Sequence, residues 1–207
     1  MARTKQQVAV AKTGTQLPAN SYHPQDRKQW RNWLQIHHAR PDGIWLVFWK
    51  KASGRALLSY DEVVEEALCF GWIDSKPNKL DEHRSLLWIA PRKPGTGWSR
   101  LNKNRVERLI ANRQMDLAGL VKVDAAKADG SWTKLDAVEN LEIPDDLRNA
   151  LAQLPAASSY FDAFPRYAKR GILEWIEIAK KAETRAKRIA ETAKLAAVNE
   201  RANQWRK

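Results

Sequence analysis

The chain has 207 residues, 36 lysine and arginine against 24 aspartate and glutamate residues, and a formal net charge of +12. Its length suits one domain, or one domain with a helical appendage, and is enough to bury a hydrophobic core. The single cysteine, Cys69, excludes an intramolecular disulfide, and no stretch approaches the roughly 18 apolar residues of a membrane span. The longest apolar run in the first twenty residues, Val8–Ala11, is too short for a secretory signal, so we expect a cytoplasmic protein.

The sequence patterns in the first part of the chain predict alternating helices and strands. Aromatic and apolar residues at helical spacing indicate a helix over residues 24–38, and the continuous apolar run 44–49 indicates a buried strand. Residues 72–75 and 85–90 predict two further strands that pair as an antiparallel hairpin.

Two helix starts carry capping signals. Ser59 and Glu62 form a capping-box pattern at the start of a helix that ends at Gly71. Ser99 is placed to cap a helix over residues 100–113. Helices and strands therefore alternate over the first half of the chain.

The sequence patterns in the second half of the chain predict helices and no strands. Residues 116–128 and 144–154 have helical patterns, and a short helix should contain residues 160–161. A last, long helical pattern begins near Pro165, with an apolar stripe that becomes alanine-rich towards its end. These elements predict an α+β fold: a small, mostly antiparallel sheet with helices packed on it, followed by a C-terminal helical region.

We expect three parts. Residues 1–20 should form a disordered basic arm, residues 21–114 an α+β core domain, and residues 115–207 a C-terminal helical region packed on the core.

The charge is distributed unevenly along the chain. Residues 92–113 hold seven basic side chains and one acidic one, and residues 166–207 hold twelve basic and five acidic ones, whereas residues 114–165 hold four basic and nine acidic ones. This polarity favours an anionic partner such as a phosphorylated ligand, nucleic acid or an acidic membrane surface. A solvated basic face that only aids solubility is the alternative.

Residues 70–102 concentrate aromatic, acidic and basic side chains. Residues 94–97 precede the helix that begins at Arg100. The free amides of this helix, with Arg92, Lys93 and Arg100 nearby, could bind an anion, and a plain capped loop is the alternative. Asn102 falls in the apolar stripe of that helix, so its amide needs either a structural partner or a ligand.

Two segments of the chain resemble the YdeI/OmpD-associated family, also called the bacteriocin-protection or OmdA-like family. The first consists of residues 67–74 with Pro91-Arg92, Trp98-Ser99 and Asn102, and the second lies within residues 175–189. The resemblance covers about residues 24–198. It implies a bacterial protein with a small α+β domain followed by helices, and an association with stress or tolerance of cationic antimicrobial peptides.

The first hypothesis is a binding protein with a pocket for an anionic or aromatic small ligand. Trp98 would pack the ligand, Arg92 would hold its charge, and Ser99 and Asn102 would fix its orientation. The predicted ligand-binding residues are Trp72, Asp74, Arg92, Trp98, Ser99 and Asn102.

Two other functions remain open. Tryptophans interleaved with basic residues could bind single-stranded nucleic acid, with Arg100 and Lys103 on the phosphates. An enzyme could use Asp74 or Glu65 as acid or base, although an ion pair between Asp74 and Arg92 is the more common arrangement.

Metal binding and thiol catalysis are disfavoured. The histidines and the cysteine show no CxxC or HExxH spacing, and Cys69 lies among apolar residues as a packed thiol. We expect no metal and no cofactor. The residues considered are His23, His37, His38, Cys69 and His83.

Overall fold

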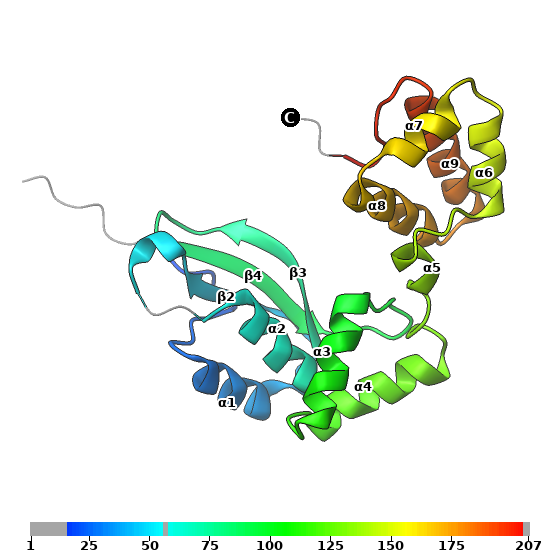
Figure 1. The fold of residues 1–207 in the computed structure, drawn as a ribbon. Helices are drawn as coiled ribbons and strands as arrows, with labels where there is room; N and C mark the ends of the chain where they lie inside the picture. Colours follow the sequence, from blue (N-terminus) through cyan, green and yellow to red (C-terminus); the bar gives the residue numbers. More distant parts are fainter. Residues whose placement is uncertain (1–15, 56–57, 205–207) are drawn as a thin grey trace, which may run out of the picture. The chain divides into compact units, whose positions relative to one another are not determined.

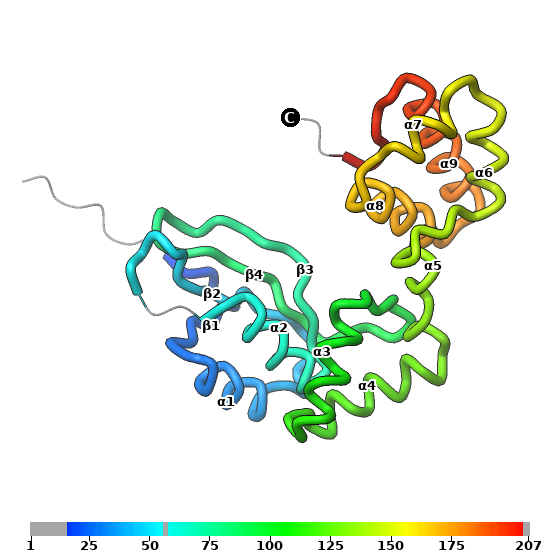
Figure 2. Tube along the Cα trace, in the orientation of Figure 1, coloured from blue at the N-terminus to red at the C-terminus, as the bar shows by residue number. Residues whose placement is uncertain are grey.

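The computed structural model describes residues 16–55 and 58–204. It contains two compact units. Figures 1 and 2 show the path of the chain through its helices and strands. The first comprises residues 1–92 and 113–121, and the second residues 93–112 and 122–207. The boundary predicted at residue 114 stays a prediction, and most of the predicted arm, residues 1–15, lies outside the described residues.

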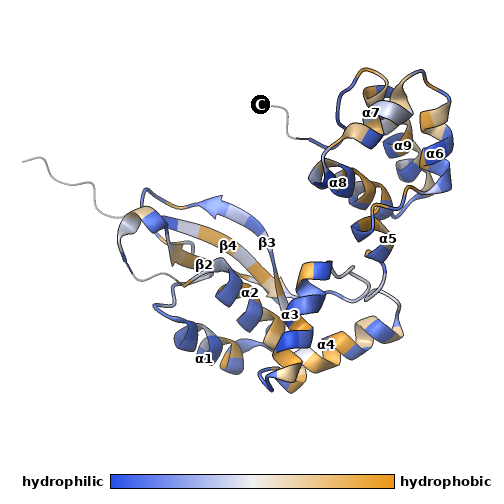
Figure 3. Ribbon diagram, viewed as in Figure 1, coloured by the Kyte–Doolittle hydropathy of each residue, from blue (hydrophilic) through white to orange (hydrophobic). Residues whose placement is uncertain are grey.

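The first unit contains a four-stranded sheet in the order β1-β2-β4-β3. Only β1 and β2 are parallel; β4 runs antiparallel to both β2 and β3. The predicted strand and hairpin are confirmed, and so is the mostly antiparallel sheet. Figure 3 shows that β4 is more hydrophobic than β3. The strands are β1 (Ser21–Tyr22), β2 (Ile44–Trp49), β3 (Trp72–Lys79) and β4 (Arg84–Pro91).

Two helices pack side by side in this unit, α1 (Arg27–His37) and α2 (Tyr60–Cys69) (Figure 1). The indole nitrogen of Trp30 on α1 donates a 3.0 Å hydrogen bond to the Val63 carbonyl on α2. The capping box predicted for Ser59 and Glu62 is confirmed, because each bonds the backbone of the other. Aromatic and aliphatic side chains from both helices and the sheet form the core, including Trp30, Leu34, Ile44, Leu46, Val63, Val64, Leu68, Trp72 and Ile89.

The second unit is helical, as the sequence predicts for the C-terminal half. Helix α4 (Leu117–Ala128) begins in the first unit and continues into the second. The core of the second unit is built from side chains such as Leu147, Leu151, Phe161, Ile172, Ile176, Ile189 and Ala193. Its other helices are α3 (Arg100–Ala111), α5 (Asp136–Glu139), α6 (Asp145–Ala152), α7 (Ala157–Ala163), α8 (Arg166–Glu177) and α9 (Ala182–Ala196).

The single helical pattern predicted from Pro165 onwards is wrong. The chain forms two helices, α8 and α9, with a break at residues 178–181. The break contains neither glycine nor proline, so no local signal marks it. Tertiary packing sets it instead: α9 packs on α6, α7 and α8, and Arg185 holds Asp146 of α6 with a 2.7 Å ion pair.

No helix within residues 16–55 and 58–204 is long and apolar enough to span a membrane.

Candidate anion-binding site

The six residues of the predicted ligand pocket are divided between the two units. The pocket that would combine them stays a prediction. Three lie in the first unit and three in the second: Trp72, Asp74 and Arg92, then Trp98, Ser99 and Asn102.

In the first unit, two of the three predicted residues make hydrogen bonds within the fold. Trp72 is buried, and its indole nitrogen donates a 2.9 Å hydrogen bond to the His38 carbonyl. Asp74 accepts a 2.7 Å hydrogen bond from the Tyr60 hydroxyl. Its ion pair with Arg92 stays a prediction. Arg92 is also buried, and burial lowers the pKa of its guanidinium to about 10, so that it remains a cation at neutral pH.

In the second unit, two of the predicted residues organise the start of α3. The Ser99 hydroxyl accepts a 3.3 Å hydrogen bond from the Asn102 amide, which confirms Ser99 as the cap of this helix. The side-chain oxygen of Asn102 accepts a 2.7 Å hydrogen bond from Arg105. Trp98 is buried with its ring centroid 5.0 Å from that of Trp132. Asn102 therefore has the structural partner that its place in the apolar stripe requires.

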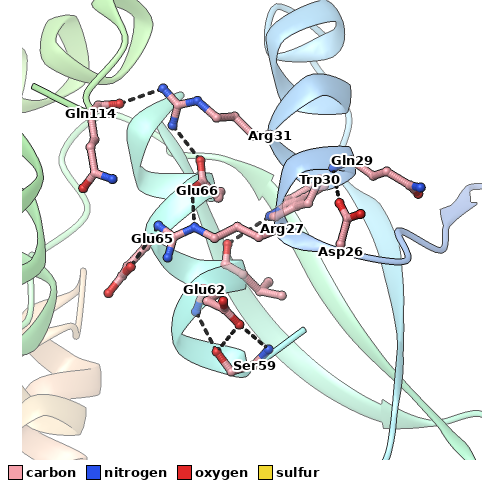
Figure 4. Close-up of polar contacts among 11 residues, drawn as sticks. Asp26, Arg27, Gln29, Trp30, Arg31, Ser59, Glu62, Glu65, Glu66 and Gln114 are labelled. Atoms are coloured by element: carbon pink, nitrogen blue, oxygen red, sulfur yellow. Dashed lines mark hydrogen bonds and ion pairs between the residues drawn. The ribbon is translucent and has the colours of Figure 1, made fainter. Parts of the chain in front are cut away.

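The alternative catalytic carboxylate, Glu65, belongs to an ion-pair network between α1 and α2 (Figure 4). It lies 3.1 Å from Arg27, which also binds Glu66 at 2.6 Å. The ion pair with Arg27 gives Glu65 a structural contact between the two helices. Catalysis by Glu65 stays a prediction.

The two cations of the nucleic-acid alternative also have partners within the second unit. Arg100 donates a 2.5 Å hydrogen bond to the side-chain oxygen of Asn140, and Lys103 forms an ion pair with Asp136. Each contact would compete with a phosphate group for the cation.

A different group of residues lines a cavity of about 390 Å³ at one end of the sheet in the first unit. We call this cavity the basic pocket. Its volume lies within the range of small-molecule sites, about 300–1,000 Å³. It is lined by Trp49, Ser53, Arg55, Asp81, His83 and Arg84.

Strand pairing brings the basic pocket together. Trp49, the last residue of β2, stands opposite Arg84, the first residue of β4. The Lys50 amide extends this ladder by donating a 2.8 Å hydrogen bond to the His83 carbonyl. Because the two strands are antiparallel, the end of one and the start of the other meet at the same edge of the sheet.

A tight turn after β2 brings Arg55 back to the ring of Trp49. The short 3₁₀ helix Lys51–Ser53 ends at Gly54, whose φ of 66° is a left-handed conformation that glycine adopts without strain. The guanidinium carbon of Arg55 consequently lies 4.5 Å from the centre of the Trp49 ring. Within the described residues, Arg55 has no carboxylate partner.

Asp81 holds the segment 81–84, which also lines the basic pocket. Its Oδ1 accepts hydrogen bonds from the amides of His83 (2.9 Å) and Arg84 (2.7 Å), and its Oδ2 lies 2.6 Å from Nη2 of Arg84. Burial by itself would raise the pKa of Asp81, but these hydrogen bonds and the Arg84 charge lower it below its ordinary value. The carboxylate of the pocket is thus already engaged by Arg84.

The imidazole of His23 packs against the ring of Trp49. The His23 ring centroid is 4.9 Å from that of Trp49, and its Nε2 is buried without a hydrogen-bond partner among the described residues. Desolvation, followed by the positive charges of Arg84 and Arg55, lowers the pKa of His23, against the opposing effect of Asp81. The imidazole is therefore neutral at pH 7, and its pKa depends on the charges of both arginines.

None of the residues that line the basic pocket is among the six ligand-binding residues predicted from the sequence. The signal that could have found it is the pair of charged segments flanking the predicted strands, residues 50–55 after the first and residues 81–84 before the last. Strand pairing is needed to place the two segments side by side. Within the described residues, no group of three or more histidine, cysteine or acidic side chains could hold a metal ion.

The fold and the basic pocket define a basic α+β protein with a C-terminal helical unit. Residues 140–199 match the family model described as "Bacteriocin-protection, YdeI or OmpD-Associated", so the chain carries a region of the YdeI/OmpD-associated family. This match includes the second resembling segment, residues 175–189. Residues 22–122, which contain the first segment, match a different model, a domain of unknown function (DUF8412). No curated protein and no solved structure matches the chain.

Proposed function

We propose that this protein binds a small anionic ligand in the basic pocket. The observation that carries the proposal is the arrangement of the charges: Arg55 lies over Trp49 beside Arg84, and the pocket's carboxylate, Asp81, is already held by Arg84. An anion entering the pocket would gain the Arg55 charge without displacing a carboxylate from it. A guanidinium packed on an aromatic ring is also partly pre-oriented, which reduces the entropy lost on binding.

The chemistry of the pocket favours a compact phosphate or carboxylate attached to a planar group. Guanidinium groups present planar donors that match both kinds of anion. The half-buried Trp49 offers an aromatic surface beside them. Phosphate carries more charge than carboxylate, and we expect it to bind more tightly.

Binding can be tested by titrating the full-length protein with phenyl phosphate and inorganic phosphate, using calorimetry and tryptophan fluorescence. We expect saturable binding that is at least about tenfold weaker in Arg55→Gln, the loss typical of a charge-assisted contact. Arg148→Gln is the matched control, because Arg148 is an exposed arginine of the second unit with a 3.8 Å contact to Asp145. It should bind as the wild type does.

A third variant separates this proposal from the pocket predicted from the sequence. If Arg92→Gln abolishes phenyl phosphate binding while Arg55→Gln leaves it unchanged, the ligand site is the predicted one. Absence of saturable binding to the wild type would remove the proposal altogether.

We propose further that ligand binding contributes to tolerance of bacteriocins or other stress. The support is the description of the family matched by residues 140–199. Expression in a bacteriocin-sensitive bacterial host should increase survival, and Arg55→Gln should reduce that gain while Arg148→Gln keeps it. Equal survival with and without the protein would contradict a protective role.

A further inference from the structure

The second unit contains an apolar pocket with an acidic rim. Its cavity is about 390 Å³ and lies beside α5, the following link and α8. Val138, Leu173 and Ile176 form the apolar floor, and all three are buried. Glu142, Asp145 and Glu177 stand on the rim. We call this cavity the acidic-rim pocket.

The floor offers a preformed apolar surface. Leu173 and Ile176 are three residues apart on α8, so they lie on the same side of that helix. Val138 from the short helix α5 completes the surface. All three also belong to the core of the second unit, so the floor is held by the packing beneath it. A ligand with an aliphatic stem can therefore bury area here without rearranging the unit.

The rim carboxylates are weakly engaged by the protein's own cations. The Asp145 side chain is 97% exposed and lies 3.8 Å from Arg148. Glu177 is 3.4 Å from Arg185, which holds Asp146 more closely at 2.7 Å.

The third rim carboxylate has a neutral partner. Glu142 accepts a 2.9 Å hydrogen bond from the side-chain amide of Asn140 and forms no ion pair within residues 16–55 and 58–204. Lys134 also lines the pocket, so the lining side chains include three carboxylates and one ammonium group. Arg148 and Arg185 contact two of these carboxylates from outside the lining.

We propose that the acidic-rim pocket binds a primary alkylammonium ion. The aliphatic stem would lie on the Val138, Leu173 and Ile176 floor, and the ammonium group would sit among the rim carboxylates. An ammonium ion has three donors, which can be shared between carboxylates from different segments. A neutral alcohol of the same length would lose the charge interaction, and an alkyl carboxylate would be repelled.

Hexylammonium chloride is a suitable probe, titrated into the full-length ¹⁵N-labelled protein and followed by amide shifts and calorimetry. We expect saturable shifts at α5 and α8 that weaken with salt, with 1-hexanol binding more weakly and hexanoate weakest. The double variant Asp145→Asn/Glu177→Gln should lower hexylammonium affinity at least about fivefold, as expected for two partly exposed charge pairs.

Two controls make the result specific. Glu183→Gln removes an acid of α9 that pairs with the exposed Lys187, and it should leave hexylammonium affinity unchanged. Arg55→Gln, in the other unit, should do the same, so this inference and the anion-binding proposal can fail independently. Equal binding of hexanoate and hexylammonium, equal losses in the double variant and Glu183→Gln, or absence of saturable shifts would each overturn the inference.

Discussion

Glu66 of α2 accepts a 2.7 Å hydrogen bond from Arg31 of α1, although the Glu66 side chain is only 3% exposed (Figure 4). Its other oxygen binds Arg27 at 2.6 Å, so one buried carboxylate holds two cations. Arg31 continues the network by donating a 2.8 Å hydrogen bond to the Gln114 carbonyl. The Glu66 carboxylate on α2 is thus bound to α1 directly, and through Arg31 it is linked to the start of residues 113–121.

Glu66→Gln should lower the free energy of unfolding by about 2 kcal/mol, because two charge-assisted contacts are weakened while the arginines remain about one-third exposed to water. Chemical denaturation monitored by tryptophan fluorescence will measure the change. Glu82→Gln, an exposed acid in the same unit, is the control and should change stability by less than about 0.5 kcal/mol. Equal effects of the two variants would show that the network contributes nothing specific.

Gly119 of α4 lies against the end of α2. A Cβ at this position would be 2.3 Å from the Cys69 carbonyl oxygen, which is backbone and cannot move aside cheaply. The Asp116 amide fixes the approach by donating a 3.1 Å hydrogen bond to the same carbonyl. Gly119→Ala should therefore destabilise the protein by about 2 kcal/mol or more.

Gly171, in the interior of α8, provides the matched substitution. A Cβ there would meet nothing within 4 Å, so Gly171→Ala should stabilise the protein by about 0.5–1 kcal/mol through the higher helix propensity of alanine. Thermal melts of both variants test the pair of predictions. A stabilising Gly119→Ala would mean that α4 does not approach Cys69 so closely.

Much of the fold follows from local signals. The strand at residues 44–49 is marked by its apolar run, and the capping pairs at Ser59 and Ser99 are complete within a few residues. The break between α8 and α9 and the two-residue strand β1 have no such signal, because packing partners distant in sequence create them. Local pattern therefore predicts the type of an element better than its interruption.

The candidate site depends even more than the fold on contacts between residues that are distant in sequence. Trp72 and Trp98, which the sequence selects as ligand-binding residues, are buried, whereas Trp49, which it does not select, is half-buried beside a cavity. The sequence concentrates aromatic, acidic and basic side chains in residues 70–102, a range that does not contain Trp49. Only the pairing of β2 with β4 reveals that Trp49 and Arg84 share one end of the sheet.

Cys69 should be unreactive in the native protein. Burial, followed by the negative charge of Glu66, raises the pKa of its thiol to about 11. Very little reactive thiolate is therefore present at pH 8. We expect iodoacetamide to modify Cys69 slowly in buffer and rapidly in concentrated urea, as measured by mass spectrometry. The raised pKa also implies a contribution to stability that is complete below about pH 8.5 and is lost as the pH rises towards 11. Equal labelling rates in buffer and urea would contradict the buried position.

His23 links the stability of the first unit to pH. Desolvation and the charges of Arg84 and Arg55 lower its pKa, so the unfolded chain binds a proton more readily than the folded one. His23 therefore makes the protein less stable as the pH falls below the ordinary histidine pKa of about 6.5. Denaturation curves at pH 7.5 and 5.5 should show this loss, and His23→Gln should reduce it.

The same histidine reports on the basic pocket. Arg55→Gln removes one of the charges that lower the His23 pKa, and so the pKa measured by NMR titration should rise. Phenyl phosphate bound near Arg55 and Arg84 should also raise it, because the anion opposes their fields at the imidazole. Arg148→Gln should leave the His23 titration as it is in the wild type. A His23 pKa that responds to neither Arg55→Gln nor phenyl phosphate would mean that the arginine charges do not reach the ring, and would remove the electrostatic basis of the proposed anion site.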